Sequence, residues 1–290
     1  MPAGYDRPGM SDEPQAGPLE RLLRRLQLER LDRDLYLGDP GRGSGRLFGG
    51  MVAAQSYLAA AATVEAGEIH SLHAYFLRPG RHDAPLRFVV DRIRDGRTYA
   101  TRRVVAHQAG EAIFSLEASF TLPETGLSHA EPMPAAPSPE GLPDWERVRA
   151  DRPDDAERRS ARSPIDIRAV DTSAEPGAIR RVWMRPKGTL PEDPALHAAA
   201  IIFASDRGLL STVARYHGLP YDRTASASLD HALWFHRPPR WDGWLLYTTT
   251  SHAAHNGRAL VFGTMYSQDG TLLASVAQEG LIRRPRNQPA

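Results

Sequence analysis

Two stretches of this sequence decide its fold: SLHAYFLRPG at residues 71–80 and SLDHALWFHRPP at residues 228–239. Each is a short apolar and aromatic run around a histidine, and each is closed by Arg-Pro. The spacing between matching residues stays nearly constant, at 158, 161 and 160 positions for the pairs His73 and His231, Gly96 and Gly257, and Gly110 and Gly270. This period is far too long for a solenoid, so the pattern indicates two copies of one domain.

Each copy is predicted to hold one central helix followed by a meander of antiparallel strands. The alanine-rich residues 49–67 and 193–218 predict the helices, and Asp193-Pro194 is typical of a helix start. Runs typical of strands follow at residues 86–94, 98–108 and 111–122, and again at 244–252, 259–268 and 271–283. Turns are expected at Asp95-Gly96, Ala109-Gly110, Asn256-Gly257 and Asp269-Gly270. A helix wrapped by such a sheet is the hotdog plan, so the predicted fold is α+β, a double hotdog.

The remaining segments set the expected domain boundaries. Residues 1–17 are rich in Pro, Gly and acidic side chains and predict a disordered tail, and residues 286–290 predict another. The hotdog units are expected at 18–122 and 165–285, and the first opens with an amphipathic helix running into a strand. Residues 123–164 have little periodicity and many prolines and charges, so we expect a linker there.

Composition excludes several kinds of chemistry. The chain has no cysteine, which excludes thiol nucleophiles, disulfides and cysteine-bound metals. Lys187 is its only lysine, and the net charge is +1, so neither Schiff-base catalysis nor general nucleic-acid binding is indicated. Hydrolase-elbow, phosphate-loop and zinc-protease motifs are absent. We expect no membrane insertion, because no apolar run approaches the roughly 20 residues of a span. With no signal-peptide pattern, the expected location is cytoplasmic.

The chain resembles the type II acyl-CoA thioesterases of bacteria and their peroxisomal relatives. The similar segments are RLFGGMVAAQ, HSLHAYFLRPG, RIRDGRTYATRRVVAHQ, SLDHALWFHRP and ASVAQEGLIR, in the family's order. They cover most of residues 18–285, with only the linker unmatched. The resemblance implies a double hotdog that hydrolyses acyl-CoA to a fatty acid and CoA. It implies no metal, no cofactor and no covalent intermediate.

The same resemblance implies a catalytic set of Asp206, Ser228 and Gln278. Asp206 follows the phrase IIFAS on the second central helix, Ser228 stands two residues before Asp-His, and Gln278 precedes Glu-Gly in the last strand. Family members of bacterial origin carry threonine at the hydroxyl position, so Ser228 is a mild departure. The chemistry fits these residue types, because a carboxylate can take a proton from water while a hydroxyl and an amide orient it. Backbone N–H groups at a helix start suit the oxyanion.

Other polar residues are alternatives at the site. His70 competes as a catalytic residue because HSLH is itself a strong family phrase. Asp230 and His231 look like an acid–base pair, yet neighbours in a strand point to opposite faces, so we interpret both as structural. His252 and His255 have a spacing that suggests a metal, but no carboxylate stands nearby.

Comparison of the two copies predicts one site per chain. On the repeat register, Ser228 corresponds to His70, Gln278 to Ala118, and Gln55 stands where Asp206 does. The first copy has therefore lost the set and helps to build the acyl pocket. We expect that pocket between helix and sheet, lined from MVAAQSYLAAA or ALWFH, with arginines pairing with the CoA phosphates.

Two other functions fit the same fold. A hotdog acyl-CoA hydratase needs a phrase such as D-x-N-P-[LIV]-H, which is absent. A non-catalytic acyl-CoA-binding sensor is disfavoured by the intact Asp206, Ser228 and Gln278. In either case acyl-CoA is the expected partner, and exposed sheet edges or faces predict a homo-oligomer, a dimer or tetramer.

Overall fold

The computed structural model describes residues 16–149, 153–171, 179–220 and 224–283, and the predicted tails fall almost wholly outside these ranges. The first hotdog unit comprises α1 (Pro18–Leu26), β1 (Glu29–Asp32), β2 (Leu35–Gly38), α2 (Gly49–Ala61), β3 (Glu68–Phe76), β4 (Leu86–Asp95), β5 (Tyr99–Gln108) and β6 (Glu111–Thr121). The second comprises β7 (Ile165–Ala169), β8 (Ile179–Pro186), α5 (Pro194–Ser205), α6 (Leu209–Tyr216), β9 (Ala225–Ser228), β10 (Asp230–Phe235), β11 (Leu245–His255), β12 (Arg258–Ser267) and β13 (Leu272–Arg283). The double hotdog is confirmed.

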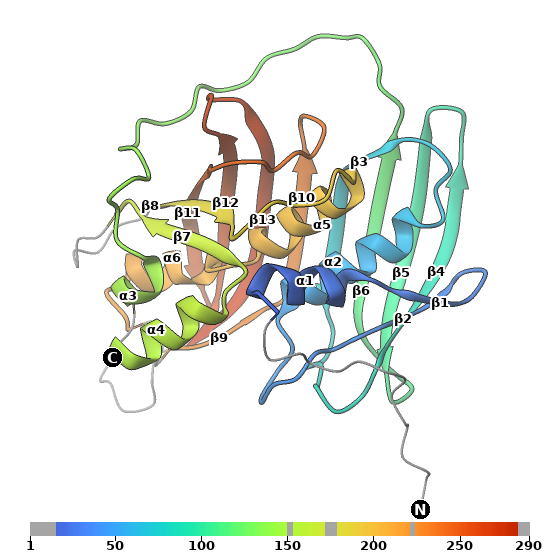
Figure 1. Ribbon diagram of the computed structural model, residues 1–290, viewed down its shortest axis with the longest axis horizontal. Coiled ribbons are helices and arrows are strands. Elements are labelled where there is room, and N and C mark those ends of the chain that lie inside the picture. The colour runs from blue at the N-terminus through green and yellow to red at the C-terminus, as the bar shows by residue number, and fades with distance from the viewer. Residues whose placement is uncertain (1–15, 150–152, 172–178, 221–223, 284–290) are drawn as a thin grey trace, which may run out of the picture.

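The strands of both units form one continuous antiparallel sheet. Its order is β1-β2-β4-β5-β6-β3-β10-β13-β12-β11-β8-β7, with β9 paired to β13. The units meet where β3 pairs with β10, so that Leu72 lies opposite Leu233. Figure 1 shows the two halves of the sheet on either side of this junction, with α2 and α5 against the same face. Edge pairing between the units is thereby satisfied within the chain.

The two central helices are buried because they are apolar on every side. Alanine and other small residues dominate both α2 and α5, and nearly every residue of each is buried. The helices run antiparallel and touch closely: a Cβ atom on Gly50, at the start of α2, would lie 2.6 Å from the backbone oxygen of Phe203, near the end of α5. Asp193 caps α5 as predicted, accepting a hydrogen bond from the N–H of Ala195 at 2.9 Å.

The hairpin turns follow the sequence prediction. Ala109-Gly110 joins β5 to β6, and Asn256-Gly257 joins β11 to β12. All four residues have positive φ, between 49° and 85°. A two-residue hairpin turn of this kind needs positive φ at both central positions, which explains the glycines.

The predicted helix at residues 193–218 is wrong in one respect, because the structure breaks it in two. α5 ends at Ser205, Asp206 is its C-cap, and α6 begins at Leu209. Gly208 has a φ of 75°, a left-handed conformation that ends the helical path. Asp206 therefore sits at a corner of the chain rather than on the side of a helix.

The predicted linker also contains ordered structure. Residues 123–144 run across one end of the molecule as a long connection (Figure 1), and α3 (Trp145–Arg149) and α4 (Pro153–Arg162) follow it. Trp145 and Ala156 are buried, so these helices pack against the second unit. Glu146 on α3 pairs with Arg207 at 3.1 Å. The predicted linker thus contacts Arg207, the residue after Asp206, an interaction that its composition did not predict.

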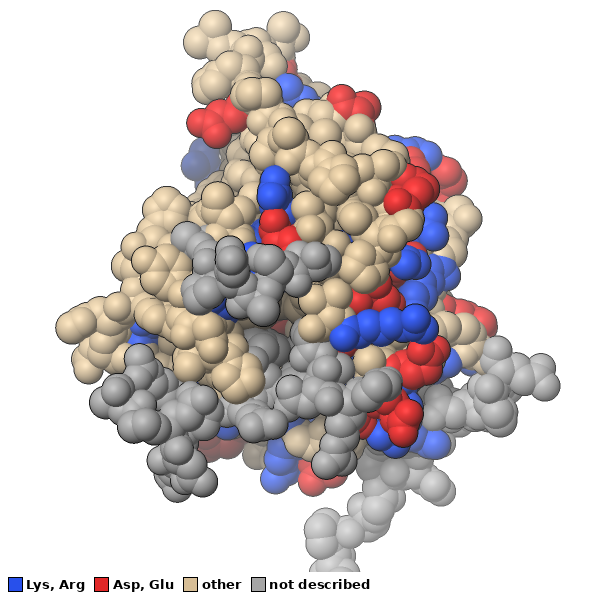
Figure 2. Space-filling model, turned by 90° about the vertical axis from the view of Figure 1, so that its left-hand side faces the viewer, with Lys and Arg blue, Asp and Glu red and all other residues tan. Residues whose placement is uncertain are grey.

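Charges of both signs mix on the surface. Figure 2 shows Lys and Arg side chains interleaved with Asp and Glu in a band on one face, without a continuous basic area among the residues coloured there. This agrees with a net charge of only +1. Within the described ranges, no helix has the length and apolar character needed to cross a bilayer.

Candidate active site

A cavity of about 510 Å³ opens where the two units meet. Its walls come from the start of α2, the end of β3 and the residues after it, the corner between α5 and α6, and strands β9 and β13. Asp206, Ser228 and Gln278 all line it. The structure therefore brings the predicted catalytic set together, although the three residues lie on three different elements of the second unit.

Asp206 is held by the first unit. Its Oδ2 accepts a hydrogen bond from the backbone N–H of Gly50 at 2.8 Å. Gly50 is the second residue of α2, where N–H groups have no partner within the helix and the helix dipole favours an anion. Arg207 pairs with Glu146 instead, so the carboxylate of Asp206 faces the cavity rather than its neighbour.

Ser228 and Gln278 complete a chain of hydrogen bonds to Asp206. The hydroxyl of Ser228 donates to Oδ1 of Asp206 at 3.4 Å, a long contact. Nε2 of Gln278 donates to Oγ of Ser228 at 2.9 Å. Ser228 is partly exposed to the cavity, whereas Gln278 is only 1% exposed. The amide is thus fixed, and the hydroxyl remains accessible to a small molecule.

The pKa of Asp206 is raised above its ordinary value. Burial beside the apolar helices is the largest cause, because it disfavours the charged carboxylate. The proximity of His231 and hydrogen bonds from Gly50, Gln278 and Ser228 act in the opposite direction but do not cancel it. A raised pKa makes the carboxylate a stronger proton acceptor, as a general base requires.

A second layer of side chains lies behind Gln278. Nδ1 of His231 is 2.7 Å from Oε1 of Gln278, and Nε2 of His231 is 2.9 Å from Oγ of Ser205. The hydroxyl of Tyr247 donates to the backbone oxygen of Ser205 at 2.8 Å, which satisfies a carbonyl at the end of α5. His231, Ser205 and Tyr247 are all buried. Tyr247 thus fixes the end of α5, the position from which Asp206 projects, while His231 links Ser205 to Gln278.

Sequence reasoning missed these supporting residues. Gly50 was visible only as part of a Gly-Gly pair at a helix start, which hints at close approach but names no partner. Strand alternation predicts a structural role for His231. The side chains of His231 and Asp230 do point apart, since Oδ1 of Asp230 accepts a hydrogen bond from the N–H of Glu279 at 2.6 Å. The structure also shows a contact that the sequence did not predict, between His231 and Gln278.

The competing candidates lie elsewhere. His70 is 2.8 Å from Oγ of Ser119 and stacks edge-on against Tyr99. Ser119 stands between the buried Ala118 and Phe120, so His70 lies on the outer face of the sheet, away from the cavity. His252 contacts Thr250 and Phe262. Among the described residues, no group of metal-ligating side chains forms.

Three of the predicted correspondences between the copies are wrong, and the first is that of Gln55 with Asp206. Gln55 lies within α2 and donates to the backbone oxygens of Arg25 and Asp39, whereas Asp206 lies beyond the end of α5. The C-cap of α2 is Ala62, which is the true counterpart of Asp206.

The repeated histidines also differ in register. Gln278 corresponds to Ala118, as predicted. In the last hairpin of the second unit Gln278 lies opposite Val261, and in the last hairpin of the first unit Ala118 lies opposite Arg102.

The residue that matches His231 is Leu72, not His73. Leu72 lies opposite Ala118 in the first unit, just as His231 contacts Gln278 in the second. His73 is exposed accordingly. Ser228 matches Ile69 rather than His70. Ser228 lies opposite Gly280, and Ile69 lies opposite Phe120, the residue that corresponds to Gly280. His70 is the extra residue of a β-bulge and has no counterpart.

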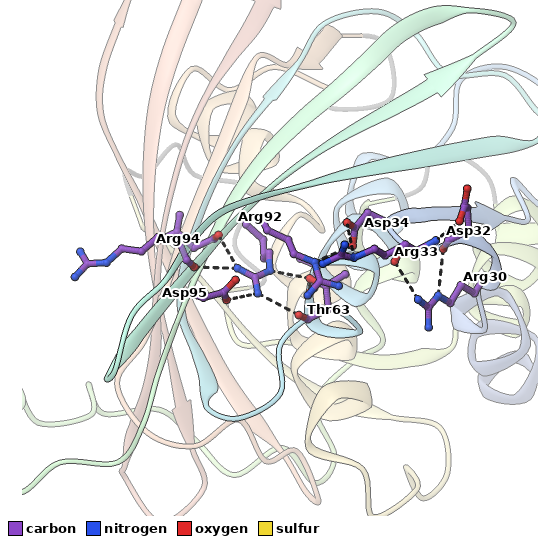
Figure 3. Close-up of polar contacts among 11 residues, drawn as sticks. Arg30, Asp32, Arg33, Asp34, Thr63, Arg92, Arg94 and Asp95 are labelled. Carbon is purple, nitrogen blue, oxygen red and sulfur yellow. Dashed lines mark hydrogen bonds and ion pairs between the residues drawn. The ribbon is translucent and has the colours of Figure 1, made fainter.

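In the first unit, a buried arginine occupies the position at the end of the central helix that Asp206 and Gln278 occupy in the second unit. Arg102 is 1% exposed, and its guanidinium donates to Oγ1 of Thr63 at 2.8 Å and to the backbone oxygen of Arg94 at 2.9 Å. Figure 3 shows Thr63, Arg94 and Asp95 gathered at this position, with dashed lines marking the contacts. The end of α2 is thus tied to the sheet by Arg102, where the second unit has Asp206 beside Gln278. The first unit thus has a structural contact at the position where the second unit has the predicted catalytic residues.

Few of the residues expected to line the acyl pocket line this cavity. Of the helical stretch MVAAQSYLAAA, Val52 lines the cavity, and no residue of ALWFH does. Its other apolar walls come from Phe76, Phe114, Leu209 and Leu210. Residues 232–236 do not line the cavity: in the pairing of β10 with β13, Ala232 lies opposite Ala277 and Phe235 opposite Ala274, farther along β13 than Gln278.

Comparisons with known proteins agree with this architecture. Residues 157–281 match the family model described as acyl-CoA thioesterase, and residues 39–121 match the acyl-CoA thioesterase N-terminal domain. The chain belongs to the acyl-CoA thioesterase family, and it is a thioester hydrolase.

Curated relatives and solved structures of this family cover nearly the whole chain. Acyl-coenzyme A thioesterase 8 of Mus musculus is 38% identical over 279 residues, covering 89% of this chain and 87% of the relative. Acyl-CoA thioesterase 2 of Haemophilus influenzae is 33% identical, with 91% of this chain and 98% of the relative covered. The crystal structure of acyl-CoA thioesterase II TesB2 from Mycobacterium marinum has a TM-score of 0.79 at 39% identity, covering 93% of this chain and all of that one.

Proposed function

We propose that this chain hydrolyses acyl-CoA by direct attack of a water molecule, which Asp206 deprotonates while Ser228 and Gln278 hold it in place. The observation that carries this proposal is the hydrogen-bonded chain from Gln278 through Ser228 to Asp206 on one cavity wall. A carboxylate with a raised pKa, next to an accessible hydroxyl and a fixed amide, has the chemistry needed to activate water.

The reaction balances without a cofactor. Water oxygen attacks the thioester carbon as Asp206 accepts its proton, giving a tetrahedral intermediate. The C–S bond then breaks, and the proton on Asp206 passes to the departing CoA thiolate. The products are a fatty acid and CoA, and the carboxylate is restored. The start of α2, whose first residue Gly49 lines the cavity, provides partial positive charge for the oxyanion.

The cavity also suits the two ends of the substrate. Val52, Phe76 and Leu210 give apolar surface for the acyl chain. Arg46 and Arg78 line the same cavity and are candidates for the CoA phosphates, which arginine binds through charge-assisted hydrogen bonds. Arg78 is also paired with Glu111 at 2.7 Å, so Arg46 is the stronger candidate.

The test is release of free thiol from a series of acyl-CoAs from acetyl to stearoyl, which a thiol reagent can follow without background because the chain has no cysteine. Asp206→Asn should lose about 10²-fold or more in turnover while still binding acyl-CoA. Asp193→Asn is the matched control: Asp193 also receives a backbone N–H at a helix start, but lies outside this cavity, and asparagine caps equally well. Full turnover in Asp206→Asn would overturn the assignment.

We also propose that the chain forms a homo-oligomer through the outer face of its sheet. Tyr75, Ile93 and Phe262 leave large apolar surface exposed there, at 63%, 56% and 41%. Light scattering after size exclusion would test this, and a monomer at all concentrations would contradict it. The cytoplasmic location remains a prediction, which cell fractionation would test.

A further inference from the structure

Gln278 can contribute to the site only in one orientation of its amide. The two ends of a glutamine amide have nearly the same shape, but the nitrogen donates and the oxygen accepts. With Nε2 towards Ser228, the amide donates into the chain that ends on the carboxylate of Asp206. The reverse orientation would place the amide oxygen towards that negatively charged end. Something in the protein must therefore select the productive orientation.

His231 is placed to make that selection. Its ring is 1% exposed and does not line the cavity, so it cannot touch the substrate. Nδ1 lies 2.7 Å from Oε1 of Gln278. An amide oxygen only accepts hydrogen bonds, so Nδ1 must carry a proton for this contact to be favourable. A protonated Nδ1 would in turn oppose the NH₂ group of a reversed amide, because two donors would meet.

Ser205 allows this arrangement whether the ring is neutral or charged. Its Oγ is 2.9 Å from Nε2 of His231 and 2.9 Å from the backbone oxygen of Ile202. When the ring is neutral, the hydroxyl donates to Nε2. When the ring is charged, Nε2 donates to the hydroxyl, which then donates to Ile202. Either way Nε2 has a partner and Nδ1 keeps its proton, as a buried polar ring requires.

The first unit gives independent support. There Leu72 occupies the position of His231, and Ala118, opposite it, occupies the position of Gln278. The unit whose corner is closed by Arg102 thus lacks both members of the pair, not just the amide. A histidine needed only to fill the core would have no reason to be absent where the glutamine is absent.

We propose that His231 is a positioning residue that fixes the amide of Gln278 with its NH₂ group towards Ser228 and Asp206, and that Ser205 supports it by bonding to Nε2. This inference rests on the proposed role of Gln278 in hydrolysis. It assigns to the Asp-His phrase a part in the reaction that does not require contact with acyl-CoA.

A double-mutant cycle measures the dependence. His231→Leu copies the first unit, Gln278→Ala removes the amide, and the double variant combines them. We expect each single change to lower kcat by about 10- to 100-fold with little change in KM, and the double variant to be no slower than the slower single one. His231→Asn, which offers an amide N–H near the position of Nδ1, should regain part of the rate. His236→Leu is the matched control, since His236 also bonds to a serine, Ser275, but not to Gln278.

Multiplied losses in the double variant, or a normal kcat in His231→Leu, would overturn the proposal. If His231→Leu loses activity because the protein unfolds, two milder variants, His231→Asn and Ser205→Ala, replace it in the cycle. Their effects on kcat should likewise vanish in the Gln278→Ala background. Persistence of those effects in that background would also overturn it.

Nitrogen-15 NMR of histidine-labelled protein gives a readout that does not depend on turnover. The ring signals that disappear in His231→Asn belong to His231, and their shifts should show a protonated Nδ1 at the pH of the assay. An unprotonated Nδ1 would contradict the proposal even in an active enzyme. If the wild-type chain released no thiol from any acyl-CoA, the proposed function would fail while this spectrum still decided the orientation of the pair.

Discussion

The carboxylate of Asp206 and the backbone N–H of Gly50 are joined by a hydrogen bond of 2.8 Å although 156 residues separate them. Asp206 belongs to the second hotdog unit and Gly50 to the central helix of the first. The helix start in one unit therefore holds and electrostatically favours the anion supplied by the other. The proposed site therefore draws on both units, which gives a physical reason for keeping both in one chain.

Gly50 should tolerate no side chain. A Cβ atom there would lie 2.6 Å from the backbone oxygen of Phe203, which cannot move without shifting α5. We expect Gly50→Ala to destabilise the fold by about 1–3 kcal/mol and to lower kcat by more than about 10-fold, because the N–H moves away from Asp206. Thermal unfolding and thiol release measure the two effects. Gly243→Ala, with open space around its Cβ, should change neither, and equal behaviour of the two variants would contradict the close packing.

The rate of hydrolysis should fall on the acid side at an unusually high pH. Burial raises the pKa of Asp206, and only the ionised carboxylate can accept a proton from water. As the pH drops through that raised pKa, the base becomes protonated and kcat/KM declines. The acidic limb should therefore lie above about 3.9, the ordinary aspartate value. A pH–rate profile tests this in the range where the protein stays folded, and a limb at the ordinary value would show that the base is not desolvated.

The same raised pKa predicts that Asp206→Asn stabilises the protein at neutral pH. A folded-state pKa above the unfolded one means that the folded state binds the proton more tightly. The resulting stability is present below the unfolded pKa and is lost as the pH rises through the folded pKa. Asparagine resembles the protonated form and does not pay this cost. The variant should unfold at a higher temperature than wild type at neutral pH, and the difference should shrink in acid; a variant less stable at neutral pH would contradict it.

Much of the fold was predictable because its signals are local. The strands from Leu86 to Gln108, the cap at Asp193 and the turn at Asn256-Gly257 follow from alternation, capping and turn chemistry, and the structure confirms each. The repeat then gave the doubled architecture, since a nearly constant offset reports common structure whatever the details of packing.

The errors occurred where tertiary structure decides between similar local patterns. A glycine such as Gly208 is often tolerated within a helix, so the break after Asp206 has no unique signature in an apolar sequence. One extra residue at the His70 bulge reverses which side chains face the core, because strands alternate with a period of two. Hence the sequence named Asp206, Ser228 and Gln278 through resemblance, but could not show that His231 contacts one of them.

Ser228 should be replaceable by threonine but not by alanine. Ser228→Thr keeps the hydroxyl between Gln278 and Asp206 and adds a methyl group at a partly open position. We expect its kcat within about 3-fold of wild type. Ser228→Ala removes the acceptor for the amide of Gln278 and the donor to Asp206, and should lose about 10- to 100-fold. Steady-state thiol release compares the three proteins, and an active alanine variant would show that the hydroxyl does not position water.

Tyr247 should support the site from behind. Its hydroxyl donates to the backbone oxygen of Ser205, and both residues are fully buried. Tyr247→Phe leaves that carbonyl at the end of α5 without its partner, at a cost of about 1–3 kcal/mol. Because Asp206 is the next residue, the loosened helix end should also lower kcat, by several-fold, with KM little changed. Tyr216→Phe, at an exposed tyrosine, is the control. Stability lost without any change in kcat would mean that the helix end is not what holds the carboxylate in place.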